Sequence, residues 1–360
     1  MSEEKLVPKL RFSGFKNSWD TYKLKDLLKN KSSNISINQL DENIGEYPLY
    51  GAGGFLKSID FYEMDCDYIS IVKDGSGVGN ISFHEKNSSI VNTSQYLLPK
   101  DNIDINFIFY LLQTINLDKY KTGSTIPHIY FKDYSIEKVH IPKLDEQSRI
   151  GFLFKNIDLK IKILEKKYQS YIDFKKYLMQ QIFTQKLRFD FNIIKLNDIC
   201  DINKGKQLNK ENMVNFGEYY VLNGGKEPSG YTNSWNTPAN TITISEGGNS
   251  CGYVNFNEEK FWSGGHCYYL SNLSSKIDLY YLYSYLKFIE PSIMRLRVGS
   301  GLPNIQKGDI ENIKVKTLPI NEQIKIRNVL RIIDKKISTL KVQKEHFEVF
   351  KKGLLQQMFV

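Results

Sequence analysis

Two stretches of the chain carry apolar residues at the spacing of a long helix. In the first stretch the steps between these positions alternate between four and three residues: Ile150, Phe154, Ile157, Ile161, Leu164, Tyr168, Tyr171, Lys175, Leu178 and Ile182. The second stretch repeats the alternation: Ile326, Leu330, Ile333, Ile337, Leu340, Lys344, Phe347, Lys351, Leu354 and Met358. A repeat every 3.5 residues is typical of a coiled-coil seam. The pattern therefore predicts two long helices, each interrupted at one of the matched lysines Lys175 and Lys351.

The two stretches are copies of each other. Residues 146–183 and 322–359 align without a gap at a shift of 176, and 15 of 38 positions are identical. The same shift matches GSTIPHI, which begins at Gly123, to GSGLPNI, which begins at Gly299. A shift of 173 aligns residues 68–83 with 241–256. The chain is thus a duplication of one unit, in which a variable globular part precedes a well-kept helix.

The globular parts combine short strands with short helices. Runs rich in Ile, Val, Tyr and Phe, such as residues 68–72 and 241–245, are separated by Gly, Asn and Asp clusters that favour turns. Each part also contains a short amphipathic stretch, near residues 105–115 and 277–288. The expected fold class is α+β. The glycine-rich GSGVG at 75–79 is interpreted as a hairpin turn, because a strand follows it where a dinucleotide-binding fold needs a helix.

These elements divide the chain into four segments. We expect a first globular domain at 1–143, a central long helix at 144–185, a second globular domain at 186–319 and a C-terminal long helix at 320–360. A helix of about 38 residues is about 60 Å long, which exceeds the width of a 140-residue domain. We therefore expect the helices to pair as an antiparallel coiled coil with pseudo-twofold symmetry. The alternative is that each helix packs on its own domain.

Composition and charge exclude several classes of function. The 360 residues carry a net charge of +9, but only seven of the 49 basic residues are Arg, so nucleic acid binding is plausible without being indicated by charge alone. The chain has no apolar run long enough to cross a membrane and no export signal, which predicts a cytoplasmic protein. The four Cys and five His residues are scattered, which predicts no metal site and no disulfide.

The sequence also lacks the motifs of a catalyst. It contains no GxxxxGK[ST] loop, no HExxH and no Asn/Asp-Pro-Pro-aromatic tetrapeptide of the kind found in adenine methyltransferases. Asp158 and Asp334, which lie among lysines on the helices, are interpreted as solvated ion pairs. We therefore expect a non-catalytic protein.

Each copy of the unit has three matched motifs: GSTIPHI or GSGLPNI before the helix, IPKLDEQ or LPINEQ at the helix start, and KKYLMQQIF or KKGLLQQMF at the helix end. In these motifs and in its tandem architecture, the chain is similar to the specificity subunit of type I restriction-modification enzymes. The resemblance covers essentially the whole chain. It implies that each globular domain recognises one half of a bipartite site on double-stranded DNA, while the helices set the spacing. It also implies that the helices dock two adenine methyltransferase subunits, and that two motor-nuclease subunits complete the assembly. S-adenosylmethionine would belong to these partners, with no cofactor in this chain.

Two other functions stay open at this point. One is a scaffold that uses its coiled coil to join other proteins without DNA, and the other is a methyltransferase or nuclease that acts alone.

Candidate DNA contacts lie in polar loops of both domains. In the first domain they are Lys73, Ser76, His84, Lys86, Asn92, Thr93, Gln95, Lys121, Ser124 and His128. In the second they are Asn223, Lys226, Asn249, Ser250, His266, Arg295, Arg297 and Ser300. Lys and Ser would mainly contact phosphate, whereas Asn, Gln and Arg can make bidentate contacts to bases. Arg is the commonest reader of guanine, and among these candidates Arg occurs only in the second domain. Any arginine contact to guanine is therefore expected in the half-site of the second domain.

Overall fold

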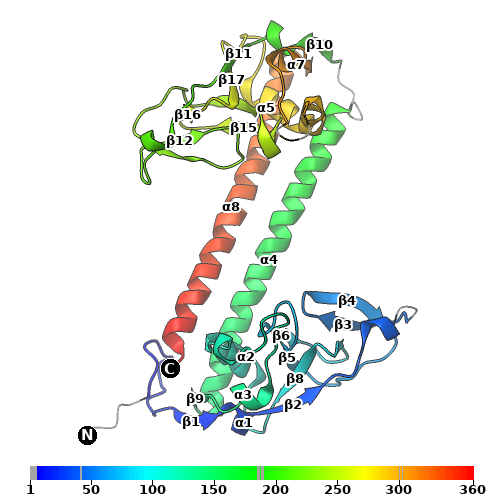
Figure 1. Ribbon diagram of the computed structural model, residues 1–360, viewed down its shortest axis with the longest axis vertical. Coiled ribbons are helices and arrows are strands. Elements are labelled where there is room, and N and C mark those ends of the chain that lie inside the picture. Colours follow the sequence, from blue (N-terminus) through cyan, green and yellow to red (C-terminus); the bar gives the residue numbers. More distant parts are fainter. Residues whose placement is uncertain (1–5, 41–42, 185–186, 188–189, 300, 302) are drawn as a thin grey trace. The chain divides into compact units, whose positions relative to one another are not determined.

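The computed structural model describes all residues except 1–5, 41–42, 185–186, 188–189, 300 and 302. The chain divides into two compact units (Figure 1). Unit 1 comprises Met1–Glu165 and Val342–Val360, and unit 2 comprises Lys166–Lys341. The long helices α4 (Leu144–Phe183) and α8 (Ile320–Met358) each contribute to both units. Each unit therefore contains one globular domain together with parts of both helices.

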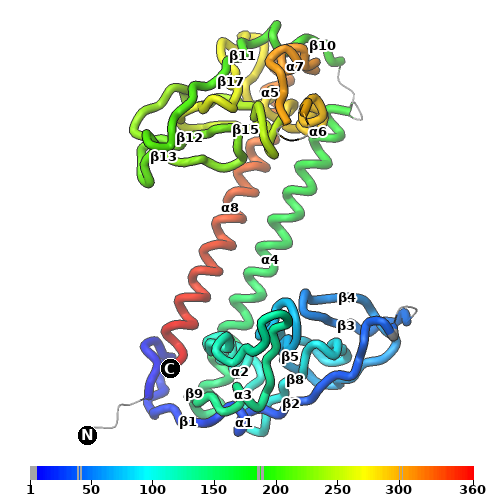
Figure 2. Tube along the Cα trace, in the orientation of Figure 1, coloured from blue at the N-terminus to red at the C-terminus, as the bar shows by residue number. Residues whose placement is uncertain are grey.

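The strands of unit 1 form three small sheets. A four-stranded sheet has the order β2-β8-β5-β6, a three-stranded sheet has the order β4-β3-β7, and β1 pairs with β9. The bounds are β1 (Asp20–Lys23), β2 (Leu28–Ser32), β3 (Tyr47–Gly51), β4 (Gly54–Ile59), β5 (Tyr68–Val72), β6 (Ile81–His84), β7 (Ser89–Ile90), β8 (Ser94–Pro99) and β9 (Lys138–Ile141). The short helices are α1 (Leu24–Leu27), α2 (Ile105–Thr114) and α3 (Phe131–Tyr134), and α2 packs on the four-stranded sheet (Figure 2).

Unit 2 repeats this arrangement. Its sheets have the orders β11-β17-β14-β15, β13-β12-β16 and β10-β18. The strands are β10 (Asn192–Lys195), β11 (Asp201–Lys204), β12 (Tyr219–Leu222), β13 (Gly230–Thr232), β14 (Thr241–Ser245), β15 (Val254–Asn257), β16 (Trp262–Ser263), β17 (Cys267–Ser271) and β18 (Lys314–Thr317). The short helices are α5 (Leu279–Phe288), α6 (Glu290–Ile293) and α7 (Lys307–Glu311).

Among the described residues each unit has nine strands, and every strand of unit 1 has a counterpart nine labels later in unit 2. The duplication and the α+β class predicted from the sequence are both confirmed. The glycine-rich segments after β5 and β14 are turns of antiparallel hairpins, as expected. Gly79 and Gly252 occupy the same place in these turns with a φ of 86° each, a left-handed conformation that glycine adopts without strain.

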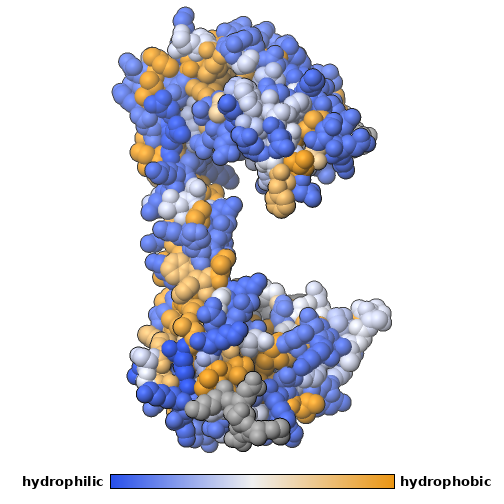
Figure 3. All heavy atoms as spheres, turned by 90° about the vertical axis from the view of Figure 1, so that its left-hand side faces the viewer, coloured by the Kyte–Doolittle hydropathy of each residue, from blue (hydrophilic) through white to orange (hydrophobic). Residues whose placement is uncertain are grey.

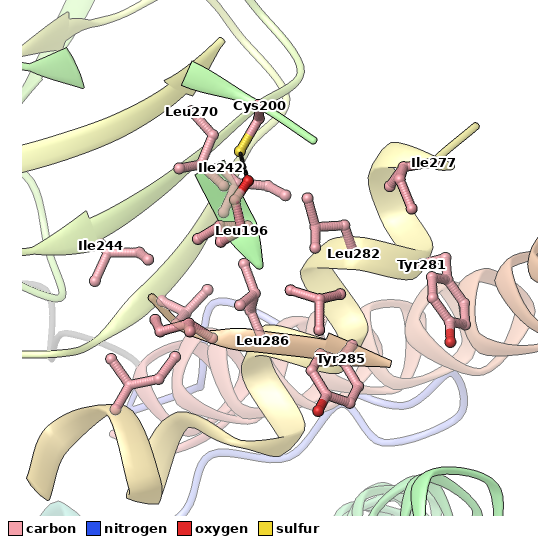
Figure 4. Packing of buried hydrophobic residues seen from close by; sticks show 14 of the residues in the cluster. Leu196, Cys200, Ile242, Ile244, Leu270, Ile277, Tyr281, Leu282, Tyr285 and Leu286 are labelled. Carbon is pink, nitrogen blue, oxygen red and sulfur yellow. Dashed lines mark hydrogen bonds between the residues drawn. The ribbon is translucent and has the colours of Figure 1, made fainter. Parts of the chain in front are cut away.

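The core of unit 2 lies between its four-stranded sheet and the helices. Ile242 and Ile244 of β14 face Leu282 and Leu286 of α5 across this layer (Figure 4). The far end of α4 belongs to the same core, because Phe183 is buried there. Its ring lies within 5.8 Å, between centroids, of the rings of three α5 residues: Tyr281, Tyr285 and Phe288.

The core of unit 1 receives the end of the other long helix in the same way. Phe359, directly after α8, packs on Phe107 of α2 and Phe154 of α4, with ring centroids 5.4 and 5.8 Å away. Trp19 approaches the same ring edge-on at 6.4 Å. Each QQxF sequence therefore anchors a helix end in an apolar core, which explains why both copies of the helix keep this ending.

The glutamine near the start of each long helix also has a structural role. The buried side chain of Gln147 accepts a hydrogen bond from the backbone N–H of Asp104, whose carboxylate caps α2. Gln323 accepts the equivalent bond from Asp278, which caps α5. The glutamine thus fixes the short helix against the long one in both units, and an unpaired buried amide would be costly.

Ion pairs join the two long helices inside each unit. In unit 1, Lys351 contacts Asp158 at 2.7 Å and Lys344 contacts Glu165 at 2.6 Å. Between these two pairs α4 advances by seven residues while α8 goes back by seven, so the two segments are antiparallel. In unit 2, Lys175 contacts Asp334 at 2.6 Å. Pairing along the whole length of the two helices stays a prediction.

The lysines that interrupt the apolar seams therefore have partners on the other helix. Asp158 also accepts a hydrogen bond from the hydroxyl of Tyr110 on α2, and Asp334 accepts one from Tyr280 on α5. Burial, together with the bond to the carboxylate, raises the pKa of both tyrosines. The expected ion pairs with lysine are confirmed, but their full solvation is corrected, because both aspartates are only partly exposed and each belongs to a Tyr–Asp–Lys network. The same network in both units reflects the duplication.

Among the helices formed by the described residues, none has an apolar stretch of the length needed to cross a membrane.

Candidate nucleic-acid interface

Three loops of unit 1 meet at the end of strand β5. They are residues 73–80, 91–93 and 121–128, and together we call them loop cluster 1. The backbone N–H of Lys73 donates to Thr93 O at 2.9 Å, and that of Gly75 donates to Pro127 O at 2.9 Å. Thr122 and His128 exchange two further backbone bonds within the third loop. These bonds fix the three loops as one surface.

Unit 2 builds the same surface with different side chains. Its loop cluster 2 consists of residues 246–252, 264–266 and 297–305, of which 300 and 302 are outside the described residues. The backbone N–H of Glu246 donates to His266 O at 2.9 Å, and that of Gly248 donates to Pro303 O at 3.0 Å. Val298 and Asn304 exchange two bonds at 2.9 Å, as Thr122 and His128 do in unit 1.

The structure brings most of the predicted contact residues together in these clusters. Loop cluster 1 contains Lys73, Ser76, Asn92, Thr93, Lys121, Ser124 and His128. Loop cluster 2 contains Asn249, Ser250, His266 and Arg297, with Asn223 beside it because the Asn223 side-chain oxygen accepts a bond from the His266 backbone. Ser300 lies outside the described residues. Contact of these residues with DNA stays a prediction.

Two predicted contact residues of unit 1 are instead buried. His84 is 7% exposed, and its Nε2 lies 2.8 Å from Ser70 Oγ while its ring stacks on Tyr68. Burial lowers the pKa of His84 from 6.5 to about 4, so the imidazole is neutral at pH 7. Gln95 is also buried and donates to the hydroxyl of Tyr134 at 2.6 Å. Both side chains satisfy polar groups inside the domain, and neither offers a surface to a nucleic acid.

The remaining three predicted residues lie outside the clusters. Lys86 is exposed beyond the end of β6, where its backbone N–H donates to Asp67. Lys226 lies 5.5 Å from the ring centroid of Tyr253. Arg295 is exposed and donates to Ser292 Oγ at 3.2 Å.

Three residues of the unit 2 site were missed in the sequence. Glu246 is buried directly after β14 and forms an ion pair with the exposed Lys204 at 2.6 Å. Asn304 forms an isolated antiparallel β-bridge with Gly247. One signal for the position of Glu246 was present, because a charged residue directly follows the five-residue buried strand in both copies, Lys73 in one and Glu246 in the other.

The clusters offer cationic and amide hydrogen-bond donors. Loop cluster 1 carries the cations Lys73 and Lys121, each beside an aspartate. Loop cluster 2 carries Arg297 and, at its edge, Lys204. Within the described part of the chain, no group of three or more His, Cys, Asp or Glu residues is arranged to hold a metal ion. Cationic and amide side chains on a fixed loop surface suit contact with phosphates and base edges.

The long helices present a second kind of surface. Phe174 and Phe350 occupy matched positions of the two helices and are 50% and 52% exposed. In unit 1 the exposed apolar residues also include Phe152 and Val349, and in unit 2 they include Ile332. Figure 3 shows apolar side chains at the surface of the helices amid mostly hydrophilic neighbours. Aromatic residues are enriched at protein–protein interfaces.

Comparison with known proteins identifies one family for the chain. Residues 16–170 and 189–347 each match the type I restriction modification DNA specificity domain. A putative type I specificity subunit of Mycoplasma genitalium is 34% identical over 163 residues, which cover 44% of this chain and 42% of that protein. This chain thus matches less than half of the length of that relative.

Two further similarities extend over nearly the whole chain. A putative type I restriction enzyme specificity subunit of Methanocaldococcus jannaschii is 23% identical over 98% of this chain and 95% of its own length. The crystal structure of the type I restriction-modification S subunit from M. genitalium superimposes with a TM-score of 0.82 at 20% identity, covering 98% of this chain and 99% of that one. That likeness shows a shared fold. Because the two matches to the family's domain together cover most of the chain, this protein belongs to the family defined by the type I restriction modification DNA specificity domain.

Proposed function

We propose that this chain is the DNA-recognition subunit of a type I restriction-modification complex in the cytoplasm, and that each loop cluster recognises one half of a bipartite site. One observation carries the proposal. The two clusters share their backbone hydrogen bonds but differ in the side chains at matched positions, Lys73 against Glu246, Thr93 against His266 and His128 against Asn304. A shared scaffold with different side chains suits two readers of different base sequences.

Each reader would divide its contacts between phosphates and bases. Lysines at the cluster edges, such as Lys73 and Lys204, would bind phosphates and hold the domain in register on the duplex. Asn92, Asn249 and Arg297 can form paired hydrogen bonds to base edges in the major groove. Each mismatched base pair typically costs about 1–3 kcal/mol, so joining two readers in one chain multiplies the discrimination.

The long helices would set the distance between the two half-sites. Helix α4 contains 40 residues and is therefore about 60 Å long at 1.5 Å per residue. Two recognition modules meet the same face of a duplex when they are about 34–36 Å apart, one turn of DNA. A rod of this length can provide that separation.

The helices would also dock the catalytic partners, because this chain carries no catalytic motif of its own. The exposed aromatic residues Phe174 and Phe350 recur once in each unit, which suits two copies of one partner. In this proposal the partners are two adenine methyltransferase subunits, which bind S-adenosylmethionine, and two motor-nuclease subunits. The methyl transfer and the cleavage belong to these partners.

A mobility-shift experiment on duplex DNA tests the proposal. The chain, its methyltransferase partner and the mixture of both are each titrated onto genomic fragments at several salt concentrations. We expect a shift for the mixture that weakens steeply as the salt concentration rises, because phosphate contacts release counterions. A stable mixture without any DNA shift would favour the scaffold alternative. Methyl transfer by the chain alone would favour the stand-alone enzyme.

A further inference from the structure

The two carboxylate oxygens of Glu246 differ in their hydrogen bonds to the residues that the structure describes: one accepts two and the other accepts none. Its side chain is 6% exposed. The Oε1 atom accepts hydrogen bonds from Lys204 Nζ at 2.6 Å and from the hydroxyl of Tyr268 at 3.1 Å. Among the described residues, Oε2 has no hydrogen-bond partner. A buried acceptor without a donor lowers the free energy of unfolding by about 1–3 kcal/mol, so such an atom in a folded protein needs an explanation.

An exposed imidazole lies close to this oxygen. His266 Nδ1 lies 3.7 Å from Oε2, too far for a hydrogen bond, and the His266 side chain is 63% exposed. The backbone of His266 is held firmly, because its carbonyl accepts from Glu246 N–H and its own N–H donates to Asn223 Oδ1. Gly224 packs so closely that a Cβ there would lie 2.5 Å from His266 O. The exposed side chain of His266 is therefore the part of this residue that is free to move toward Oε2.

We propose that Glu246 is a positioning residue for His266, and that His266 is a specificity-determining residue of the second half-site. When DNA occupies loop cluster 2, Nδ1–H closes on Oε2 and fixes both the ring orientation and the tautomer. The Nε2 atom is then an acceptor, directed at the exocyclic amino group of one base, which is N6 of adenine or N4 of cytosine. The inference rests on the proposed DNA-recognition function.

A base edge fits this arrangement better than a phosphate does. A phosphate contact requires little orientation, and Lys204 on the same carboxylate already provides a cation for it. A buried carboxylate behind the imidazole would oppose an approaching phosphate by like-charge repulsion. What the carboxylate adds is direction, since the partner of one ring nitrogen decides the role of the other.

The duplicated unit supports a role in specificity. Unit 1 has Lys73 where unit 2 has Glu246, and Thr93 where unit 2 has His266, on the same backbone hydrogen bond. The pair is therefore absent from the matched position of the other domain, although the loop scaffold is the same. A purely structural pair would be expected in both copies, as the Gln147 and Gln323 contacts are.

The test uses the complex of the full chain with its methyltransferase partner. Methylated adenines are mapped in host DNA for the wild type, Glu246→Gln, His266→Ala and the double variant. We expect both single variants to relax the consensus at the same position of one half-site by roughly tenfold, about 1.4 kcal/mol. The double variant should lose no more than His266→Ala does, because the carboxylate acts through the imidazole. The other half-site should be unchanged.

Tyr268→Phe is the matched control, because it removes a donor to Oε1 and leaves Oε2 and His266 in place. It should keep the wild-type consensus. If Glu246→Gln fails to fold, His266→Ala still decides the question, since His266 is a surface residue. Mobility shifts then use a duplex in which the identified base lacks its amino group. We expect this duplex to bind the wild type roughly tenfold more weakly, with no further loss for His266→Ala.

Three outcomes would overturn the inference. One is an unchanged consensus in His266→Ala, another is a uniform loss of affinity across all half-site sequences, and the third is an additive double variant. All three presuppose that the wild-type complex binds a bipartite site. A wild-type complex that binds no DNA would instead refute the proposed function.

Discussion

Replacing Lys351 by Met should destabilise unit 1 by about 1–2 kcal/mol. The ammonium group binds Asp158 at 2.7 Å and lies 5.1 Å from the ring centroid of Tyr110, and the Met side chain keeps the apolar stem while removing both interactions. Exposed ion pairs contribute about 0–1 kcal/mol, whereas breaking a fully buried pair costs about 3–5 kcal/mol. The side chains here are 18% and 36% exposed, and the Tyr110 bond to Asp158 remains, so an intermediate value follows.

Tryptophan fluorescence can report the loss of stability of unit 1 separately from unit 2. Trp19 is buried and touches Phe359, at the end of the helix that carries Lys351. With Trp235 and Trp262 replaced by Phe, Trp19 is the only tryptophan left. Urea unfolding of this background should show a lower free energy for Lys351→Met, and the melting temperature should fall by about 2–8 °C.

The neighbouring Lys352→Met is the matched control, because Lys352 is exposed on the same helix turn. The cycle with Asp158→Asn gives the coupling energy directly. An unchanged midpoint for Lys351→Met, or full additivity with Asp158→Asn, would show that the ion pair does not hold the helix ends together.

Three other changes give separate tests. The pKa of His84 is about 4 in the folded chain and 6.5 in the unfolded chain, so the unfolded chain binds more protons between these pH values. The unfolding free energy should therefore fall by up to about 3 kcal/mol as the pH drops from 6.5 to 4, and urea unfolding of His84→Asn should lack this contribution to the pH dependence. Alanine at Arg295 and Arg297 should relax the half-site of unit 2 alone in methylated-adenine maps, and relaxation of the other half-site would contradict the assignment. Four residues inserted near 166–168 should lengthen α4 by about 6 Å and the gap between half-sites by about one to two base pairs, whereas two inserted residues turn the seam by about 200° and should abolish methylation.

The sequence predicted those parts of the fold that depend on spacing along the chain. The duplication inferred from the shift of 176 residues recurs in the matched sheets of the two units, whereas the alternation of four and three still predicts pairing along the whole helices. The turn after β5 was predictable because a strand follows the glycines. The packing of the helix ends was not predictable, since the sequence alone does not say in which core Phe183 or Phe359 is buried.

The candidate site was predictable as a set of loops but not as individual side chains. His84 and Lys86 look alike in the sequence as polar residues after a strand, yet one is buried against Ser70 and the other is exposed. The alignment of Glu246 with Lys73 marks its position after a buried strand, but a single acidic residue in a basic protein gives no sign of its own burial. Burial depends on contacts between segments far apart in the chain, which periodicity does not encode.

The most direct test of the account is the map of methylated adenines in cells that express this chain with its methyltransferase partner. If the two units are independent readers joined by a fixed spacer, the methylated motif has two different half-sites separated by an unspecified gap of constant length. A continuous motif, a gap of variable length or the absence of any methylated motif would contradict the account.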